Sequence, residues 1–251
     1  MNISISDLGF IGFKAKALKD LPKEYGFEFF YEFGKNSYWD SIIPEIIEKR
    51  KIISIHAPCV SVNLADESNS ECFAILRKTF AYALKCKASF VVVHTNEVWS
   101  GDKKEIQDLV EERLKILVNI ASDYNVQILI ENVGLKTNGT LLYDWNDYKK
   151  LLKKIPEAKA LLDIGHANIN EWDIANCIET IGDNLVALHL HDNNGKEDSH
   201  KAIGKGSIKW NRIFKSIKKN TPNAHLVLEY ADITMPELLI NIEKIKGKYL
   251  E

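Results

Sequence analysis

The sequence predicts one α/β domain folded as a single (β/α)8 barrel. Short apolar runs alternate with amphipathic segments along the chain, which is typical of parallel strands joined by helices. The length of 251 residues is close to the roughly 250 of a usual eightfold barrel. Polar side chains end several consecutive runs, as catalytic side chains do at the carboxyl ends of barrel strands. We therefore expect residues 1–251 to form one domain.

Eight apolar runs are the expected strands. They are Ile3 to Ile5, GFEFFYEF (Gly26 to Phe33), KIISIHAPC with His56, SFVVVHTN with His94, QILIENVG with Glu131, ALLDIGHAN with Asp163, LVALHLHD with His189, and HLVLEY with Glu229. Between them, apolar residues recur at helical spacing. The expected helices are a short segment around Leu18 and residues 71–84, 103–124, 146–155, 174–181 and 235–246. Regular alternation without a second domain favours a closed barrel.

The run LVALHLHD places two histidines at the end of one strand. Side chains alternate along a strand, so Ala187, His189 and His191 are expected on one side, with Leu188 and Leu190 on the other. The segment that follows is rich in polar residues and glycine. We infer that the imidazoles face the inside of the barrel and mark a site at its mouth.

Composition narrows the classes of function. Lys plus Arg 33 against Asp plus Glu 35 gives a net charge of -2, so no overall positive field recruits nucleic acid or a membrane. The four cysteines lack C-x-x-C spacing and are expected to form no disulfide; Cys59 is interpreted as a buried, unreactive thiol. The chain shows no signal-like amino terminus and no run of about 18 apolar residues. We expect a soluble, cytoplasmic protein and leave an oligomer open.

Six consecutive runs end in a polar side chain: His56, His94, Glu131, Asp163, His189 and Glu229. One histidine at a strand end is usually a hydrogen-bonded core residue, but six consecutive polar ends predict a site. Burying three carboxylates in one mouth costs several kcal/mol per ion unless a cation compensates them. The three carboxylates and His189 are therefore predicted to share a divalent cation, and such oxygen-rich ligands suit Mn²⁺, Co²⁺, Mg²⁺ or Zn²⁺.

Several segments resemble the successive strand ends of one superfamily. HAPCVSVNLAD, VVVHTN, LIENVG, LLDIGHAN, HLHDNNGKEDSHKAIGKGSIKW and VLEY are similar, in this order, to the xylose isomerase-like TIM barrels, which include sugar isomerases, epimerases and endonuclease IV. Similarity to the epimerase branch implies one divalent metal on Glu131, Asp163, His189 and Glu229. His189 is chosen over His191 because an acidic residue, Asp192, follows three positions later.

The endonuclease IV branch implies three zinc ions held by nine ligands. This chain can supply all nine: His56, His94, Glu131, Asp163, His166, His189, Asp198, His200 and Glu229. The protein would then be an AP endonuclease that acts on DNA, with its metals activating the attacking hydroxide and stabilising the leaving oxygen. The nine ligands favour this interpretation, because proton transfer needs only four.

An isomerase or epimerase of a sugar or sugar phosphate is nevertheless preferred. GKGSIKW resembles the sugar isomerases, the predicted loops are short for gripping a bent duplex, and the D-x-H pattern of Asp198 and His200 is common in isomerase-like chains. The metal would stabilise an enediolate. Glu131 and Glu229 would act as acid and base, and His166 would hold a hydroxyl group.

A third interpretation is a metal-containing barrel that binds a ligand without catalysis, which the complete ligand set argues against. The further candidates for substrate binding are His191, Gly204, Gly206 and Trp99. The two glycines would leave backbone amides open to a phosphate group. Trp99, in the loop after the fourth strand, would stack on a sugar ring.

Overall fold

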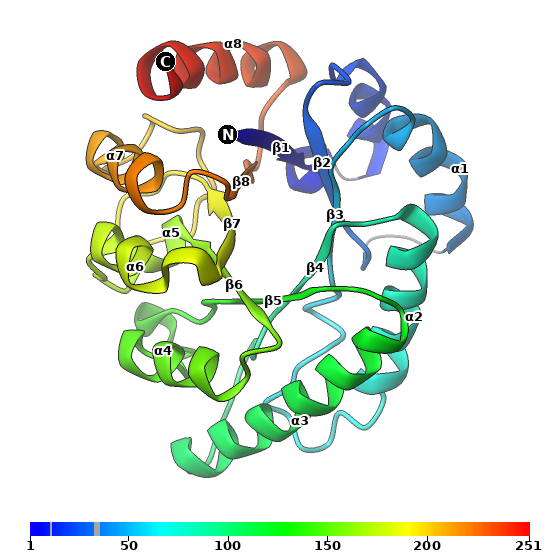
Figure 1. The fold of residues 1–251 in the computed structure, drawn as a ribbon, viewed down its shortest axis with the longest axis vertical. Helices are drawn as coiled ribbons and strands as arrows, with labels where there is room; N and C mark the ends of the chain where they lie inside the picture. The colour runs from blue at the N-terminus through cyan, green and yellow to red at the C-terminus, as the bar shows by residue number, and fades with distance from the viewer. Residues whose placement is uncertain (11, 33–35) are drawn as a thin grey trace.

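The computed structural model describes residues 1–10, 12–32 and 36–251. Its eight parallel strands form a closed barrel, as the sequence predicted (Figure 1). The strands are β1 (Asn2–Ser6), β2 (Gly26–Phe30), β3 (Ile53–His56), β4 (Phe90–Val93), β5 (Ile128–Glu131), β6 (Lys159–Asp163), β7 (Leu185–Leu190) and β8 (His225–Leu228). Each strand pairs with the next, and β8 closes the ring on β1, with His225 opposite Asn2.

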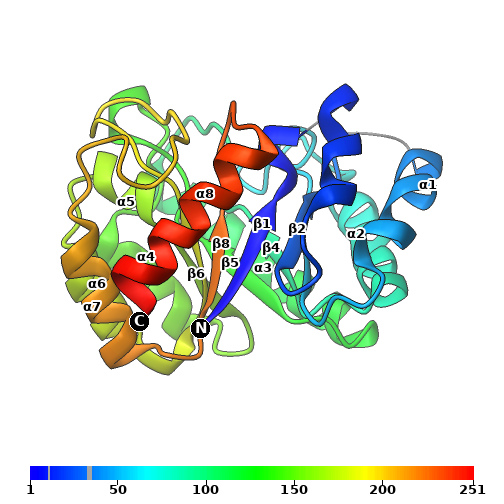
Figure 2. The same ribbon diagram turned by 90° about the horizontal axis from the view of Figure 1, so that it is seen from above.

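The helices surround the ring of strands (Figure 1). They are α1 (Asn36–Ile47), α2 (Cys72–Cys86), α3 (Lys103–Asp123), α4 (Trp145–Lys154), α5 (Ile164–Ile169), α6 (Ile174–Ile181), α7 (Trp210–Asn220) and α8 (Met235–Ile245). Short 3₁₀ or π segments span Asp7–Phe10, Gly12–Asp20, Lys136–Asn138, Gly182–Asn184 and Lys246–Leu250. Figure 2 shows both chain termini at the end of the barrel where β1 begins. None of the helices in the described part of the chain is long and apolar enough to cross a membrane.

The alternation of side chains divides the strands between two cores. Leu188 and Leu190 pack into the main core between strands and helices. Ala187 instead joins a small inner cluster formed with Phe90, Val92, Leu129 and Leu161. This is the alternation expected for β7, and it leaves His189 on the inner side.

Polar residues fix where several helices begin. The side chain of Asp102 accepts hydrogen bonds from two backbone amides at the start of α3, and that of Asp144 does the same for α4. Thr234 and Glu237 form a capping box at the start of α8. Asp163 caps α5, so this helix starts directly at the end of β6.

The sequence-based bounds differ from the structure in a few places. The second run was expected to reach Phe33, but β2 ends at Phe30 and position 33 lies outside the described residues. The segment around Leu18 is a 3₁₀ helix rather than an α-helix. The run ALLDIGHAN was expected as a strand, but β6 ends at Asp163 and α5 begins at Ile164. Helices α1, α5 and α7 were not predicted.

Candidate metal centre

Three carboxylates lie around Nδ1 of His189 at the carboxyl ends of β5 to β8. We name these four residues the inner cluster: Glu131, Asp163, His189 and Glu229. Nδ1 of His189 lies 3.5 Å from Oε1 of Glu131, 3.8 Å from Oδ2 of Asp163 and 3.4 Å from Oε2 of Glu229. All four residues are at most 3% exposed. Ligands that bind one tetrahedral cation through bonds of about 2.0–2.1 Å lie roughly 3.3 Å apart. The distance from Nδ1 of His189 to each of the three carboxylates is therefore close to that of two ligands on one cation.

Buried atoms without hydrogen bonds support the same conclusion. Oε2 of Glu131, Nδ1 of His189 and Oε1 of Glu229 have no hydrogen-bond partner among the described residues. Leaving a buried polar group unpaired costs about 1–3 kcal/mol, and native proteins avoid it. Divalent cations bound at the mouth would satisfy these atoms, so the residues present fit a metal.

Glu28 on β2 orients the ring of His189. Oε1 of Glu28 lies 2.8 Å from Nε2 of His189, and Ser54 Oγ donates to Oε2 of Glu28 at 2.7 Å. A carboxylate only accepts, so Nε2 carries the proton and Nδ1 keeps a free lone pair for a metal. Sequence analysis missed Glu28, although it is an acidic residue within an aromatic run, at alternate spacing with Phe30.

The electrostatics of the inner cluster favour positive charge. Burial alone would raise the pKa of Glu131, but the charges of His189 and His94 hold that pKa well below its usual value. Burial alone would lower the pKa of His189, but the charges of Glu229, Glu131 and Glu28 raise that pKa well above its usual value. A proton and a metal ion therefore compete for Nδ1 of His189.

Two histidines extend the inner cluster toward β3 and β4. Nε2 of His56 and Nε2 of His94 lie 3.4 Å and 3.2 Å from Oε2 of Glu131. Nδ1 of His56 lies 2.8 Å from the carbonyl oxygen of Ala57, and Nδ1 of His94 lies 2.6 Å from Oε1 of Glu97. These acceptors take the Nδ1 protons and leave both Nε2 atoms free to bind a metal.

A third cluster also borders the mouth: His166, Asp198 and His200. Nε2 of His166 and Nε2 of His200 each lie 3.1 Å from Oδ2 of Asp198. Burial alone would lower the pKa of His200, but the hydrogen bond with Asp198 and the charge of Glu229 raise it to about 9. The nine candidate ligands thus form three adjoining groups, with Glu131 shared between two of them.

Asp192 holds the loop that carries Asp198 and His200. Its carboxylate accepts from the amides of Gly204 and Ile208 at 2.9 Å and 3.2 Å and from the Trp210 indole at 2.9 Å. The amide of Gly204 is therefore occupied rather than open. A Cβ at Gly206 would lie 2.3 Å from Oδ1 of Asp192, so close packing explains this glycine.

His191 and Trp99 lie away from the open part of the site. Nε2 of His191 lies 3.1 Å from both carboxylate oxygens of Asp163, its ring stacks on His200 at 3.8 Å, and it is fully buried. This contact orients Asp163. Trp99 lines a separate surface hollow with Asn63 and Ile106.

The three clusters border one cavity of about 360 Å³. Asn96, Asn138 and Thr140 add neutral polar groups to its wall, and Leu8 and Phe30 add apolar surface. None of the described residues that line it is a lysine or an arginine. The cavity is at the small end of the range for small-molecule sites, which is about 300–1,000 Å³.

Known proteins share this fold across most of the chain. The sequence profile of the xylose isomerase-like TIM barrel matches residues 11–246. An uncharacterized protein of Methanocaldococcus jannaschii is 30% identical over 197 residues, which cover 77% of this chain and 76% of that protein. The crystal structure of a D-tagatose 3-epimerase-like protein has a TM-score of 0.87 at 24% identity, covering 100% of this chain and 97% of its own. An AP endonuclease, family 2, from Brucella melitensis has a TM-score of 0.79 at 13% identity, with 99% of both chains covered.

Proposed function

Because the chain belongs to the xylose isomerase-like TIM barrel family, we propose that it is a divalent-metal-dependent isomerase or epimerase of a sugar. The observation that carries this proposal is a pair of buried carboxylates that border the cavity. Glu131 and Glu229 lie 3.5 Å and 3.4 Å from the same atom, Nδ1 of His189. An isomerase moves a proton between neighbouring carbons, and an epimerase moves a proton from one face of a carbon to the other. Both reactions use an acid and a base beside the reacting carbon, and two carboxylates can fill these roles.

The inner cluster would hold the metal through Glu131, Asp163, His189 and Glu229. When bound there, a cation would supply the positive charge that stabilises an enediolate. The carboxylates of Glu131 and Glu229 would accept and return the proton. The charges of Asp163 and Asp198 raise the pKa of His166 well above its usual value, against the lowering effect of burial. Nδ1 and Nε2 of the His166 ring lie 3.2 Å from the carbonyl oxygen of Asn132 and 3.1 Å from Oδ2 of Asp198, so the protonated ring would hold a substrate hydroxyl by exchanging one of these partners.

The wall of the cavity supports an uncharged sugar as the substrate. Phosphate groups are commonly bound by lysine, arginine or open backbone amides. The described lining lacks both cationic residues, and the Gly204 amide donates to Asp192. A sugar phosphate is therefore the less favoured substrate.

A phosphodiesterase is the second candidate, because the nine candidate ligands form three adjoining groups. His166 and His200 flank Asp198 at 3.1 Å, and His56 and His94 flank Glu131 at 3.4 Å and 3.2 Å. Such a site would accommodate several metals. The described lining contains no lysine or arginine, which argues against it, since DNA binding rests mainly on contacts to phosphates.

Exchange of substrate protons with solvent deuterium tests the proposal. Tag-free protein loaded with Mn²⁺ or Co²⁺ is expected to exchange the C–H proton next to the carbonyl in at least one ketose or aldose, as followed by NMR. Glu229→Gln is expected to slow this exchange about 10²- to 10⁴-fold, as loss of a general base does, and Glu179→Gln, at an exposed position on α6, is the matched control.

The metal content of Glu229→Gln is measured alongside, so that a lost base is distinguished from a lost metal. Metal-loaded protein that exchanges no sugar but nicks abasic duplex DNA, with the nicking lost in Glu229→Gln, would establish the second candidate instead.

A further inference from the structure

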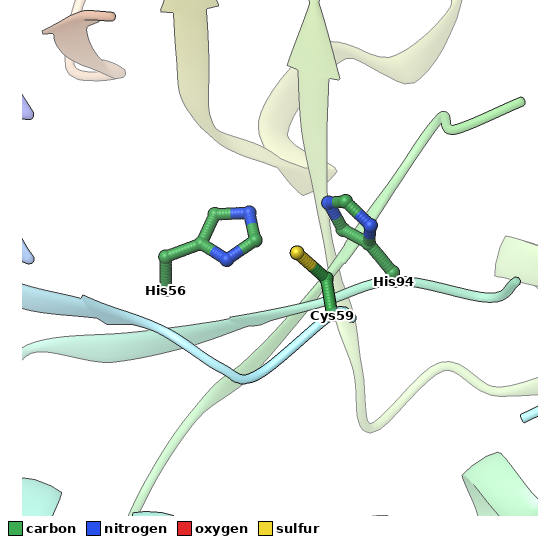
Figure 3. Close-up of side chains that lie close together, drawn as sticks. All are labelled: His56, Cys59 and His94. Atoms are coloured by element: carbon green, nitrogen blue, oxygen red, sulfur yellow. The ribbon is translucent and has the colours of Figure 1, made fainter. Parts of the chain in front are cut away.

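Cys59 lies beside the two outer histidines at the mouth. Figure 3 shows its sulfur close to the rings of His56 and His94, and one candidate ligand atom from each of the three residues lies within 4.8 Å of the others. Cys59 is only partly buried and borders the cavity, whereas Cys72, Cys86 and Cys177 are buried. A metal that enters the cavity can therefore reach Cys59.

The backbone around Cys59 is held in place by Glu32. The carboxylate of Glu32 accepts from the amides of Cys59, Val60 and Ser61 at 2.9 Å, 2.7 Å and 2.6 Å. This turn follows β3 directly, so His56 and Cys59 are presented by one rigid segment. The backbone that carries the Cys59 side chain is thus held in place by Glu32.

Glu131 supplies a second, independent indication of a ligand here. Its Oε2 atom is buried, has no hydrogen-bond partner among the described residues, and lies 3.4 Å and 3.2 Å from Nε2 of His56 and His94. Its Oε1 atom faces His189 of the inner cluster instead, at 3.5 Å. Glu131 can therefore offer one carboxylate oxygen to the inner cluster and the other to a site beside His56 and His94.

We propose that Cys59 is a metal ligand and that Cys59, His56, His94 and Oε2 of Glu131 form an outer site for Zn²⁺. Two imidazoles and a thiolate favour zinc over Mg²⁺ or Mn²⁺, which prefer oxygen ligands. Zn²⁺ binds sulfur at about 2.3 Å and imidazole nitrogen at about 2.0–2.1 Å, so His56, Cys59 and His94, whose candidate ligand atoms lie within 4.8 Å of one another, would close in around the ion. On binding, the Zn–S bond forms and the thiol proton passes to solvent.

A complete set of four protein ligands gives this outer site a structural character. Tetrahedral zinc with four protein ligands keeps no open position, whereas catalytic zinc keeps one. The outer zinc would thus fix Glu131 between β3, β4 and the inner cluster and leave the reaction to the inner metal. This inference does not depend on the sugar chemistry, because it concerns only how the outer ion is held.

Cobalt substitution tests the proposal through the spectrum of the metal. Tag-free, metal-free protein is titrated with Co²⁺ under reducing conditions. The wild type is expected to develop a near-ultraviolet sulfur-to-cobalt charge-transfer band that saturates at one sulfur-bound ion per chain. Cys59→Ser is expected to lose this band entirely, and Cys86→Ser, a change in α2, is expected to retain it.

A measurement on the wild type alone guards against a variant that does not fold. X-ray absorption of the zinc-loaded protein is expected to show a sulfur scatterer at about 2.3 Å. A zinc spectrum with only nitrogen and oxygen neighbours, or a cobalt band that survives in Cys59→Ser, would overturn the proposal. Failure of the sugar reaction would leave both spectra unchanged, so the two proposals fail separately.

Discussion

His189 is the residue on which the inner cluster depends, and Glu28 decides which of its ring nitrogens faces the metal. The two side chains are fully buried and lie 2.8 Å apart. Carboxylates that accept the second ring proton of a metal-binding histidine raise its basicity and fix its orientation. Glu28 therefore acts as a positioning residue, because it reaches the metal only through His189.

Glu28→Gln is expected to weaken Mn²⁺ binding at the inner cluster about 10- to 100-fold, as loss of such a partner does. The amide keeps the shape of the side chain but removes the negative charge next to the ring. Electron paramagnetic resonance of free Mn²⁺ measures the affinity. Ser54→Ala removes the other hydrogen bond of Glu28 but keeps its charge, so this control should bind nearly as tightly as the wild type. Equal affinity in Glu28→Gln would show that Glu28 does not position the ligand.

The ligands at the strand ends could be predicted from the sequence because each one follows an apolar run. Glu28 could not be predicted in this way, because it lies inside its run and has no motif around it. Cys59 was interpreted as an unreactive thiol because only the folded chain brings it next to His94, a residue from another strand. Sequence neighbours reveal contacts within one turn, but not contacts between strands.

At the scale of elements, the loop after β7 carries two of the nine candidate ligands, Asp198 and His200, and hydrogen bonds to Asp192 hold this loop in place. Asp192 pairs with Lys201 through a short bridge and accepts hydrogen bonds from the loop and from α7. In the sequence, Asp192 lies between His189 and the two ligands Asp198 and His200. The geometry of the third cluster therefore depends on Asp192, although Asp192 is not among the residues that border the cavity.

Asp192→Asn is expected to loosen this loop without dissolving the barrel. The amide replaces one accepting oxygen with a donor that faces backbone N–H groups, and hydrogen bonds to charged groups contribute about 1.5–3 kcal/mol. Trypsin should then cut faster after Lys196, Lys201 or Lys205, as mass spectrometry of the fragments can show. Asp183→Asn, at an exposed position before β7, should digest like the wild type. An unchanged digestion of Asp192→Asn would contradict this role of Asp192.

Three helices escaped prediction for different reasons. The short helix α5 follows Asp163 directly and lies inside a run that was expected to be a strand. Pro44 lies inside α1, and proline usually ends a helix. Helix α7 follows a glycine-containing loop, although Ile213, Phe214 and Ile217 have helical spacing and are buried. The strands were easier to locate, because buried parallel strands are short continuous apolar runs bounded by polar residues.

At the scale of the whole molecule, barrel closure explains how residues far apart in the sequence form one site. Parallel strands all end on the same side, so the last residues of β3 and β5 and those just after β4 and β8 meet at one mouth. Sequence analysis could predict this convergence from the fold class alone. It could not predict the division into three clusters, because that depends on which ring nitrogen or carboxylate oxygen faces which neighbour.

The position of a bound metal tests the central claim most directly. Crystals of tag-free protein grown with Mn²⁺ are measured at a wavelength where manganese scatters anomalously. We predict an anomalous peak within bonding distance of Glu131, Asp163, His189 and Glu229, with Nδ1 of His189 as the nitrogen ligand. Ordered crystals at saturating Mn²⁺ with no peak among these four side chains, or with His191 binding in place of His189, would contradict the account.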